Sequence, residues 1–359
     1  MIRFASLQAR TQLVTGAACL LILAVVTIIT GPHLAHLYRT DVAPCTANGD
    51  CTLQLQAFFS HDTFLQNALN LVIRVVPALI GIFWGAPLFA RELETGTYPV
   101  AWTQSVSRSR WLATKLLIGG VGAMVTAGAL SLIVTWWFRA FDLANTDVHS
   151  FSVFDQRDLV AVGYGLFAFA VGALLGAVLR RVLPAMAATL AVFVFARIAV
   201  TAWVRPRYMS ALHKSASLLQ GGFGIMSRNG SSSGLTFVAQ PSATDQSWVL
   251  HTQILDQAGN PVSQAARGAF LEQHCASVLP GGSDPLGPLT GGHHTVQAAP
   301  SPVAFQHCQA TAAKYYHALV TYQPASRYWP FQWIETGLFT ALAIGAFAAC
   351  FWWVKHRIA

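Results

Sequence analysis

Six apolar runs, each about long enough to cross a bilayer, constrain this chain more than any other feature of its sequence. A transmembrane helix needs about 20 predominantly apolar residues, because the hydrocarbon core is about 30 Å thick. Only 10% of the residues are charged, against about 25% in soluble domains. We therefore predict an all-α integral membrane protein with six transmembrane helices. The predicted spans are residues 13–33, 69–90, 111–138, 159–179, 182–204 and 332–354.

The six spans divide the chain into three predicted parts. Residues 1–204 form a five-span region whose first span is expected to end at Gly31-Pro32. Residues 205–330 form a small α+β extracellular domain between spans 5 and 6, and residues 331–359 form the sixth span and the tail. Apolar periodicity and turn residues predict the elements of the extracellular domain. They are a strand over residues 247–256 and helices over residues 263–277 and 305–319.

The positive charges predict the orientation, because Lys and Arg in short loops favour the cytosolic side. With both termini inside, ten such residues lie at cytosolic span ends and three lie in the two short outer loops. The ten are Arg3, Arg10, Arg91, Arg108, Arg110, Lys115, Arg180, Arg181, Lys355 and Arg357, and the three are Arg39, Arg139 and Arg157. We expect a multi-pass protein of the cell membrane with both termini cytosolic. Topology and anionic lipid headgroups account for the net charge of +8, so no nucleic-acid partner is expected.

Four of the six cysteines lie on the predicted outer side, where disulfides persist. We predict a bridge between Cys275 and Cys308 and a local bridge between Cys45 and Cys51. His274 and His307 precede the first pair, which suggests a Cys2His2 metal site as the alternative. Oxidation removes the thiolates that zinc needs, so the disulfide is favoured and no metal or cofactor is predicted.

The connection between the second and third spans, residues 91–110, is short, charged and rich in turn residues. An acidic pair is followed by Gly-Thr, and then by Ser-Arg before a span that opens with Lys. The residues of this pattern are Glu92, Glu94, Gly96, Thr97, Ser107, Arg108 and Lys115. The pattern resembles the loop between the second and third spans of ABC-2 type exporter permeases. Residues 197–209 and 322–335 resemble a bacterial branch of the same permeases.

This resemblance implies that residues 91–110 form a coupling loop that docks into a separate cytosolic ATPase subunit. The contacts would involve Glu92, Glu94, Gly96, Thr97 and Arg108. It also implies that the chain works with a second permease copy and exports a lipid-like, peptide or antibiotic-like substrate. The chain itself would catalyse no reaction, and its sequence has no P-loop motif for ATP. The alternative is that the connection is a solvated loop whose cations only set the topology.

Two arginines and two glycines within the spans are candidates for the substrate pathway. The resemblance implies that the second and fifth spans line a cleft between protomers, and these spans hold Arg74 and Arg197. Both arginines lie in the outer third of their spans, so they either extend to the outer headgroups or face the cleft. Gly81 and Gly85 form a G-x-x-x-G pattern that permits close helix contact. Glu335 is either an interfacial residue or an ion-pair partner for one of the arginines.

Two other classes of protein remain as rivals. A membrane-anchored sensor or receptor with an extracellular ligand-binding domain would need a cytosolic effector region. The longest cytosolic segment predicted here is the connection at residues 91–110. A polytopic enzyme would need convergent ionisable residues within the spans, where only Arg74 and Arg197 are expected.

Overall fold

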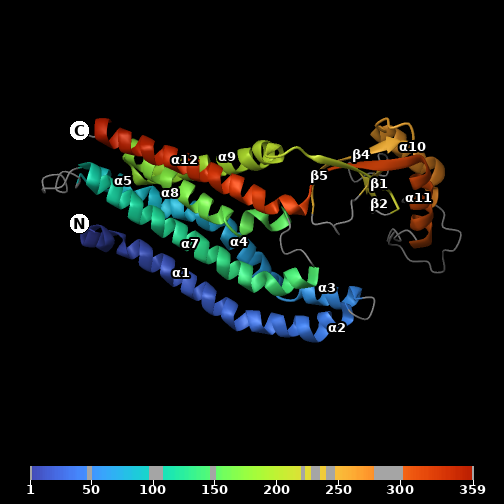
Figure 1. Cartoon of the computed structure of the whole chain (residues 1–359), viewed down its shortest axis with the longest axis horizontal. Coiled ribbons are helices and arrows are strands. Elements are labelled where there is room, and N and C mark those ends of the chain that lie inside the picture. Colours follow the sequence, from blue (N-terminus) through green and yellow to red (C-terminus); the bar gives the residue numbers. More distant parts are fainter. Residues whose placement is uncertain are drawn as a thin grey trace, which may run out of the picture. The chain divides into compact units, whose positions relative to one another are not determined.

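The chain is described by a computed structural model and divides into two compact units. Unit 1 comprises Met1–Tyr208 and Ser326–Ala359, and unit 2 comprises Met209–Ala325. The structure describes residues 2–46, 51–96, 108–145, 151–219, 223–227, 235–239, 247–278 and 302–357. Figure 1 shows the helices of unit 1 running side by side.

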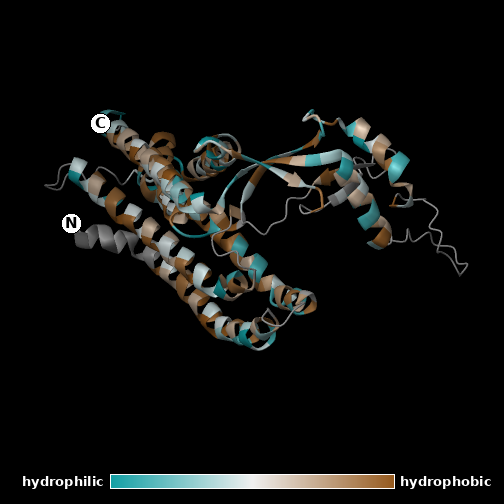
Figure 2. Cartoon of the chain, turned by 45° about the vertical axis from the view of Figure 1, so that its right-hand side comes forward, coloured by the Kyte–Doolittle hydropathy of each residue, from teal (hydrophilic) through white to brown (hydrophobic). Residues whose placement is uncertain are grey.

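Unit 1 contains six helical segments that are long and apolar enough to cross a membrane, which confirms the predicted number of spans. Within the described residues they are Val14–Cys45, Thr63–Glu94, Ser109–Ala144, Val160–Leu179, Val182–Arg207 and Ala325–Arg357. The helices that form them are α1 (Ile2–Leu37), α4 (Thr63–Ile80), α5 (Pro87–Glu94), α7 (Arg108–Asn145), α8 (Val160–Leu179), α9 (Val182–Ala199) and α12 (Tyr328–Arg357). Two short helices, α2 (Ala43–Thr46) and α3 (Thr52–Ser60), connect α1 to α4. Figure 2 shows apolar residues along the long helices, whereas unit 2 mixes polar and apolar residues.

Helix α1 continues through Pro32, so the prediction that Gly31-Pro32 ends the first span was wrong. Proline removes one backbone hydrogen bond, but a membrane helix tolerates it when neighbouring helices support the segment. Here Gly31 lets α7 approach closely, because a Cβ at this position would lie 2.9 Å from the Trp136 ring. Trp137 also donates a hydrogen bond of 2.8 Å to Thr30. Packing on α7 therefore outweighs the local helix-ending signal.

The second span contains a π-helical turn, Gly81–Gly85, that joins α4 to α5. Ala86 separates this turn from Pro87, whose backbone nitrogen has no hydrogen to donate and whose ring would clash with the carbonyl four residues earlier in a regular helix. Two glycines let the turn pack on α8. A Cβ on Gly81 would lie 2.7 Å from the Ala168 carbonyl oxygen, and one on Gly85 would lie 2.5 Å from the Phe169 carbonyl oxygen.

Helix α8 lies at the centre of unit 1 and contacts α12, α7, α9 and the α4–α5 span. Its sequence is rich in Gly and Ala, which allows this many neighbours to approach its backbone. Gly172 and Gly176 meet the π-turn and α5, and Gly163 lies against the backbone of Thr336 on α12.

Unit 2 is built on a three-stranded antiparallel sheet in the order β1-β5-β4. Its strands are β1 (Leu212–Ser217), β4 (Trp248–Asp256) and β5 (Tyr316–Gln323), and a separate hairpin pairs β2 (Phe223–Ser227) with β3 (Leu235–Ala239). Helices α10 (Gln264–His274) and α11 (Pro302–Tyr315) complete the unit.

The core of unit 2 joins this sheet to both helices. Phe237, Ile254, Leu271 and Ala318 are among its buried members. The helix predicted over residues 305–319 was too long, because the chain becomes strand β5 at Tyr316. β5 is the central strand, and pairing on both edges outweighs the helical spacing of its apolar residues.

Both predicted disulfides are present in the structure. Cys275 and Cys308 join the end of α10 to α11, with their Cα atoms 5.3 Å apart. Cys45 and Cys51 close the segment between α2 and α3, with their Cα atoms 5.7 Å apart. Cys19 is free and exposed, and Cys350 is free and buried between α12 and α8.

Candidate functional site

The end of the bundle that carries both chain termini, called here the termini end, is where α5 leads toward α7 (Figure 1). Helix α5 ends at Glu94, and the Thr95 amide still donates to the Arg91 carbonyl over 3.1 Å. Gly96 follows with φ +68°, a left-handed conformation that glycine adopts without strain and that commonly terminates helices. The sequence placed Glu92 and Glu94 in a loop, but they occupy the last turn of α5 because helix propensity persists up to this glycine.

The Glu92 carboxylate accepts a hydrogen bond from the Lys115 ammonium group and forms an ion pair with it. The side chains are 16% and 6% exposed, so water screens this pair little. Lys115 Nζ also lies 4.4 Å from the centre of the Trp111 ring, within range of a cation–π interaction. This ion pair clamps the end of α5 to the start of α7.

Glu94 links α5 to another span. Its Oε2 accepts a hydrogen bond of 3.0 Å from the Val182 amide at the start of α9. A carboxylate is stabilised there because the first turn of a helix exposes unpaired amides. Arg180, in the turn between α8 and α9, donates to the Arg357 carbonyl at the end of α12 over 2.9 Å. Four of the spans are thus linked at the termini end.

The sequence-predicted coupling residues therefore have different outcomes. Glu92, Glu94 and Gly96 are described, and both glutamates contact their own chain. Thr97 and the rest of the loop to Ser107 lie outside the described residues, as does the Arg108 side chain.

At the opposite end of the bundle, six polar side chains form a cluster that joins four segments of the chain. Its members are Asp155, Tyr164, Arg197, Arg205, Tyr208 and Glu335, called here the polar cluster. Glu335 is fully buried, and the Arg205 side chain is 5% exposed. Arg205 donates from Nε to Glu335 Oε2 over 2.8 Å and from Nη2 to Oε1 over 2.7 Å. This bidentate geometry is the strongest form of an Arg–carboxylate interaction.

The remaining members of the polar cluster contact the Arg205 guanidinium or the Glu335 carboxylate. Tyr164 donates to Glu335 Oε1, and Tyr208 donates to Oε2 over 3.3 Å. Asp155 pairs with Arg205 as a second carboxylate. Burial alone would raise the pKa of Asp155, but the guanidinium groups of Arg205 and Arg197 outweigh burial and hold the pKa below its usual range. The cluster thus balances two arginines with two carboxylates.

The structure places the two candidate pathway arginines differently. Arg197 belongs to the polar cluster, with Nη2 3.7 Å from Asp155 and its guanidinium 3.7 Å from the centre of the Tyr164 ring. Arg74 is exposed, and the Gln156 carboxamide oxygen, when directed toward it, accepts from Nη2 over 2.5 Å. Glu335 was considered either as an interfacial residue or as a partner for Arg74 or Arg197, and the structure pairs it with Arg205 instead. Arg205 was assigned to the extracellular domain, and nothing local in its sequence indicated this buried partner.

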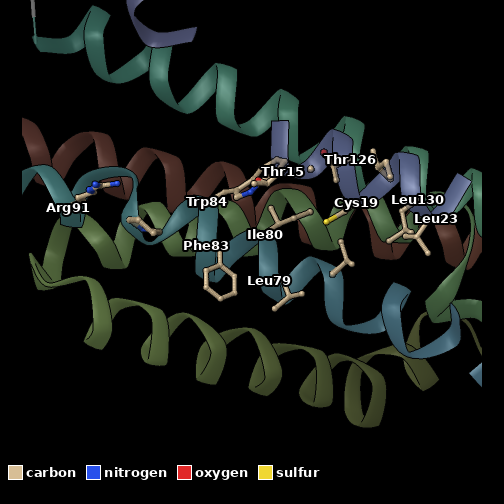
Figure 3. Close-up of a pocket in the computed structure, with 14 residues that line it drawn as sticks. Thr15, Cys19, Leu23, Leu79, Ile80, Phe83, Trp84, Arg91, Thr126 and Leu130 are labelled. Carbon is tan, nitrogen blue, oxygen red and sulfur yellow. The ribbon is translucent and has the colours of Figure 1, made fainter. Parts of the chain in front are cut away.

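An apolar groove of about 570 Å³ runs along unit 1 between α1, α7 and the α4–α5 span. Figure 3 shows Trp84, Phe83, Ile80 and Leu79 along it, with Arg91 at one end. Gly81 and Gly85 do not line this groove, because they face α8 on the other side of the same helix. Within the described part of the chain, no group of three or more His, Cys, Asp or Glu residues is placed to hold a metal ion.

Comparison with known proteins identifies the membrane part of the chain. The family model described as ABC-2 membrane transporter related matches residues 17–205, which is more than half of the chain. No curated protein and no solved structure gives a significant match. The matched residues cover nearly all of the first five spans and include Glu92, Glu94 and Lys115. The chain therefore belongs to the ABC-2 membrane transporter related family, as a multi-pass membrane component of a transporter.

Proposed function

We propose that this chain is the permease subunit of an ATP-driven exporter whose ATP hydrolysis takes place on a separate cytosolic ATPase subunit. Permeases of this family are typically non-catalytic, and the sequence contains no P-loop. The observation that carries the proposal is the Glu92–Lys115 clamp, which brackets the loop between α5 and α7. A loop with clamped ends can transmit a push to both helices, whereas an unclamped connector would absorb it.

The proposed orientation places the termini end in the cytosol. Exposed cations gather at this end, among them Arg91, Arg110, Arg181 and Lys355, as the positive-inside rule expects of cytosolic span ends. The two disulfides lie in segments assigned to the outer side, where oxidation is permitted.

The contacts at the termini end provide a route for coupling. A push on the loop would move α5 and α7 together through Glu92 and Lys115, and α9 would follow through Glu94 and Val182. The link from Arg180 to the Arg357 carbonyl would carry the motion to α12. We propose that closure of the ATPase subunits shifts the bundle in this way between inward-facing and outward-facing states.

The proposed substrate pathway lies between two copies of the chain, along the second and fifth spans. Arg74 is exposed and could attract a carboxylate or phosphate, whereas the charge of Arg197 is largely balanced by Asp155. Gly81 and Gly85 would act indirectly, by fixing the π-turn against α8. Apolar surfaces around one exposed cation suit an amphipathic substrate, such as a lipid-like compound, a peptide or an antibiotic.

The test is co-purification and ATPase activity with a candidate ABC ATPase subunit in lipid nanodiscs. Residues 97–107 are replaced by a Gly-Ser linker of equal length, and the matched control replaces residues 280–290 of unit 2 in the same way. We expect the first variant to lose the ATPase subunit while it still inserts in the membrane, and the control to retain it. Retention of a fully stimulated ATPase by the first variant would refute the coupling role, and a ligand-binding receptor would then be the better interpretation.

A further inference from the structure

The apolar groove between α1 and the α4–α5 span has a lining that matches one class of molecule. Its wall is almost entirely hydrocarbon, with Phe83 56% and Leu79 41% exposed within it. Gly16 of α1 makes room for the Trp84 ring, since a Cβ there would lie 2.7 Å from that ring. The ring thereby forms the floor of the groove. Such a lining favours an apolar chain over any polar ligand.

The long, narrow shape of the groove suits an extended, flexible chain. From Val76 to Arg91 the span rises about 22 Å, at about 1.5 Å per residue. A volume of about 570 Å³ spread over this length leaves a mean cross-section of a few tens of Å². This length exceeds the roughly 15 Å of hydrocarbon in one leaflet, so the groove can hold an acyl chain along its full length.

The charge at that end specifies the headgroup. Arg91 is exposed and lies at one end of the groove (Figure 3), three residues before the end of α5 at Glu94. Its neighbours Glu92 and Glu94 are engaged with Lys115 and Val182, so neither is directed to neutralise it. Arginine binds phosphate oxygens through two parallel hydrogen bonds. We propose that the groove binds one anionic phospholipid of the bilayer, with an acyl chain against Trp84 and the phosphate at Arg91.

In the orientation proposed above, this lipid belongs to the cytosolic leaflet, where anionic lipids meet basic span ends. It would lie against α5, with its phosphate one residue before Glu92 of the Glu92–Lys115 clamp. Binding needs neither the ATPase nor transport, so its test is independent of the proposed exporter function.

The main test is a titration of detergent-solubilised full-length protein with phosphatidylglycerol or with phosphatidylcholine of the same acyl chains. Bound lipids are counted by native mass spectrometry. One charge-assisted contact predicts a preference of about tenfold or more for phosphatidylglycerol. Arg91→Gln should abolish this preference. The matched control, Arg181→Gln, removes an exposed cation at the same end but outside the groove and should preserve it.

Cys19 provides a second measurement, because it lines the groove and is the exposed free thiol of the chain. Of the other five cysteines, four are bridged and Cys350 is buried. Phosphatidylglycerol should slow modification of Cys19 by N-ethylmaleimide several-fold, and Cys19→Trp, which fills the groove, should weaken binding of both lipids.

Four results would overturn the proposal. Equal affinity for the two lipids would show that no charge is recognised, and equal losses in Arg91→Gln and Arg181→Gln would indicate a diffuse surface attraction. Unchanged binding to Cys19→Trp would place the lipid elsewhere. An unreactive Cys19 in lipid-free protein would mean that protein already covers the groove.

Discussion

Replacement of Glu335 by glutamine tests whether the polar cluster holds α12 in the bundle. The substitution preserves the size of the side chain and removes one buried charge. Arg205 then loses its bidentate partner, and only one of Tyr164 and Tyr208 keeps its acceptor, because they donate to different carboxylate oxygens and glutamine has a single oxygen.

The expected cost follows from the burial of the pair. Removal of one partner from a buried ion pair costs about 3–5 kcal/mol, because the remaining charge is left uncompensated. Asp155 still pairs with Arg205, which favours the lower part of this range. We therefore expect Glu335→Gln to destabilise the bundle by about 3 kcal/mol, or about 100-fold in the equilibrium for opening.

The assay uses Cys350, which is fully buried on α12 with its Sγ 3.8 Å from the Ala173 carbonyl of α8. A thiol reagent reaches it only when these helices separate, so its modification rate measures their opening. The rate should rise about 100-fold in Glu335→Gln and remain unchanged in Glu272→Gln, an exposed carboxylate of α10. Peptide mapping separates Cys350 from the exposed Cys19.

A modification rate within threefold of wild type would refute this reasoning. The double variant Arg205→Met with Glu335→Leu removes both charges of the ion pair. It therefore shows whether the single variant is destabilised by the loss of the pair itself or by the charge that is left without a partner. Apolar replacement of both partners is often nearly neutral. Asp155 remains within 3.7 Å of Arg197, so the double variant should recover most of the lost stability. Failure to recover would show that the cluster acts through shape and not through charge balance.

Four further predictions follow from the same structure. Glu92→Gln and Lys115→Gln should each reduce ATPase stimulation. If the pair acts as an internal clamp, the exchange Glu92→Lys with Lys115→Glu should restore stimulation. Failure of this exchange would indicate that Glu92 contacts the ATPase directly. Gly172→Leu should reduce the yield of folded protein, because even its Cβ would lie 2.3 Å from the Gly81 carbonyl oxygen, whereas Gly345→Leu, with nothing within 4 Å, should be tolerated in size-exclusion profiles. The lowered pKa of Asp155 means that its stabilising charge is complete above about pH 4 and is lost as the pH falls through the lowered value; the difference in Tm between wild type and Asp155→Asn should therefore shrink below about pH 4. Loss of the Cys275–Cys308 bridge, which spans 33 residues, should cost about 3–4 kcal/mol and accelerate proteolysis of unit 2; an unchanged cleavage rate in Cys275→Ser with Cys308→Ser would contradict this.

The sequence predicted features that depend on composition and local spacing. The length of the apolar runs was sufficient to predict the six spans, and the placement of the cysteines was sufficient to predict both disulfides. The proline signal was less reliable, because Pro32 lies inside helix α1, which tertiary packing supports. The helical spacing around Leu319 was likewise overridden by pairing on both sides of β5.

The polar cluster could not be predicted, since its partners are brought together only by folding. Arg205 and Glu335 are separated by 130 residues, and Asp155 and Tyr164 come from two further segments. An arginine close to a span end has the same sequence signature whether it faces a headgroup or a buried carboxylate. The Glu92–Lys115 clamp was missed for a related reason, because the charges at the ends of these adjacent spans were expected to contact the ATPase subunit or to be solvated.

The central position of α8 has a consequence for the order of synthesis. Its most extensive helix contact in the described structure is with α12, which the ribosome makes about 150 residues later. At about 5–20 residues per second, this delay lasts roughly 7–30 s. During that interval α8 is already in the membrane, but the face with Gly163 and Tyr164 lacks its partner helix and Arg205 lacks Glu335. The nascent chain is thus exposed to lipid, chaperones and proteases at its most densely packed helix until the last span arrives.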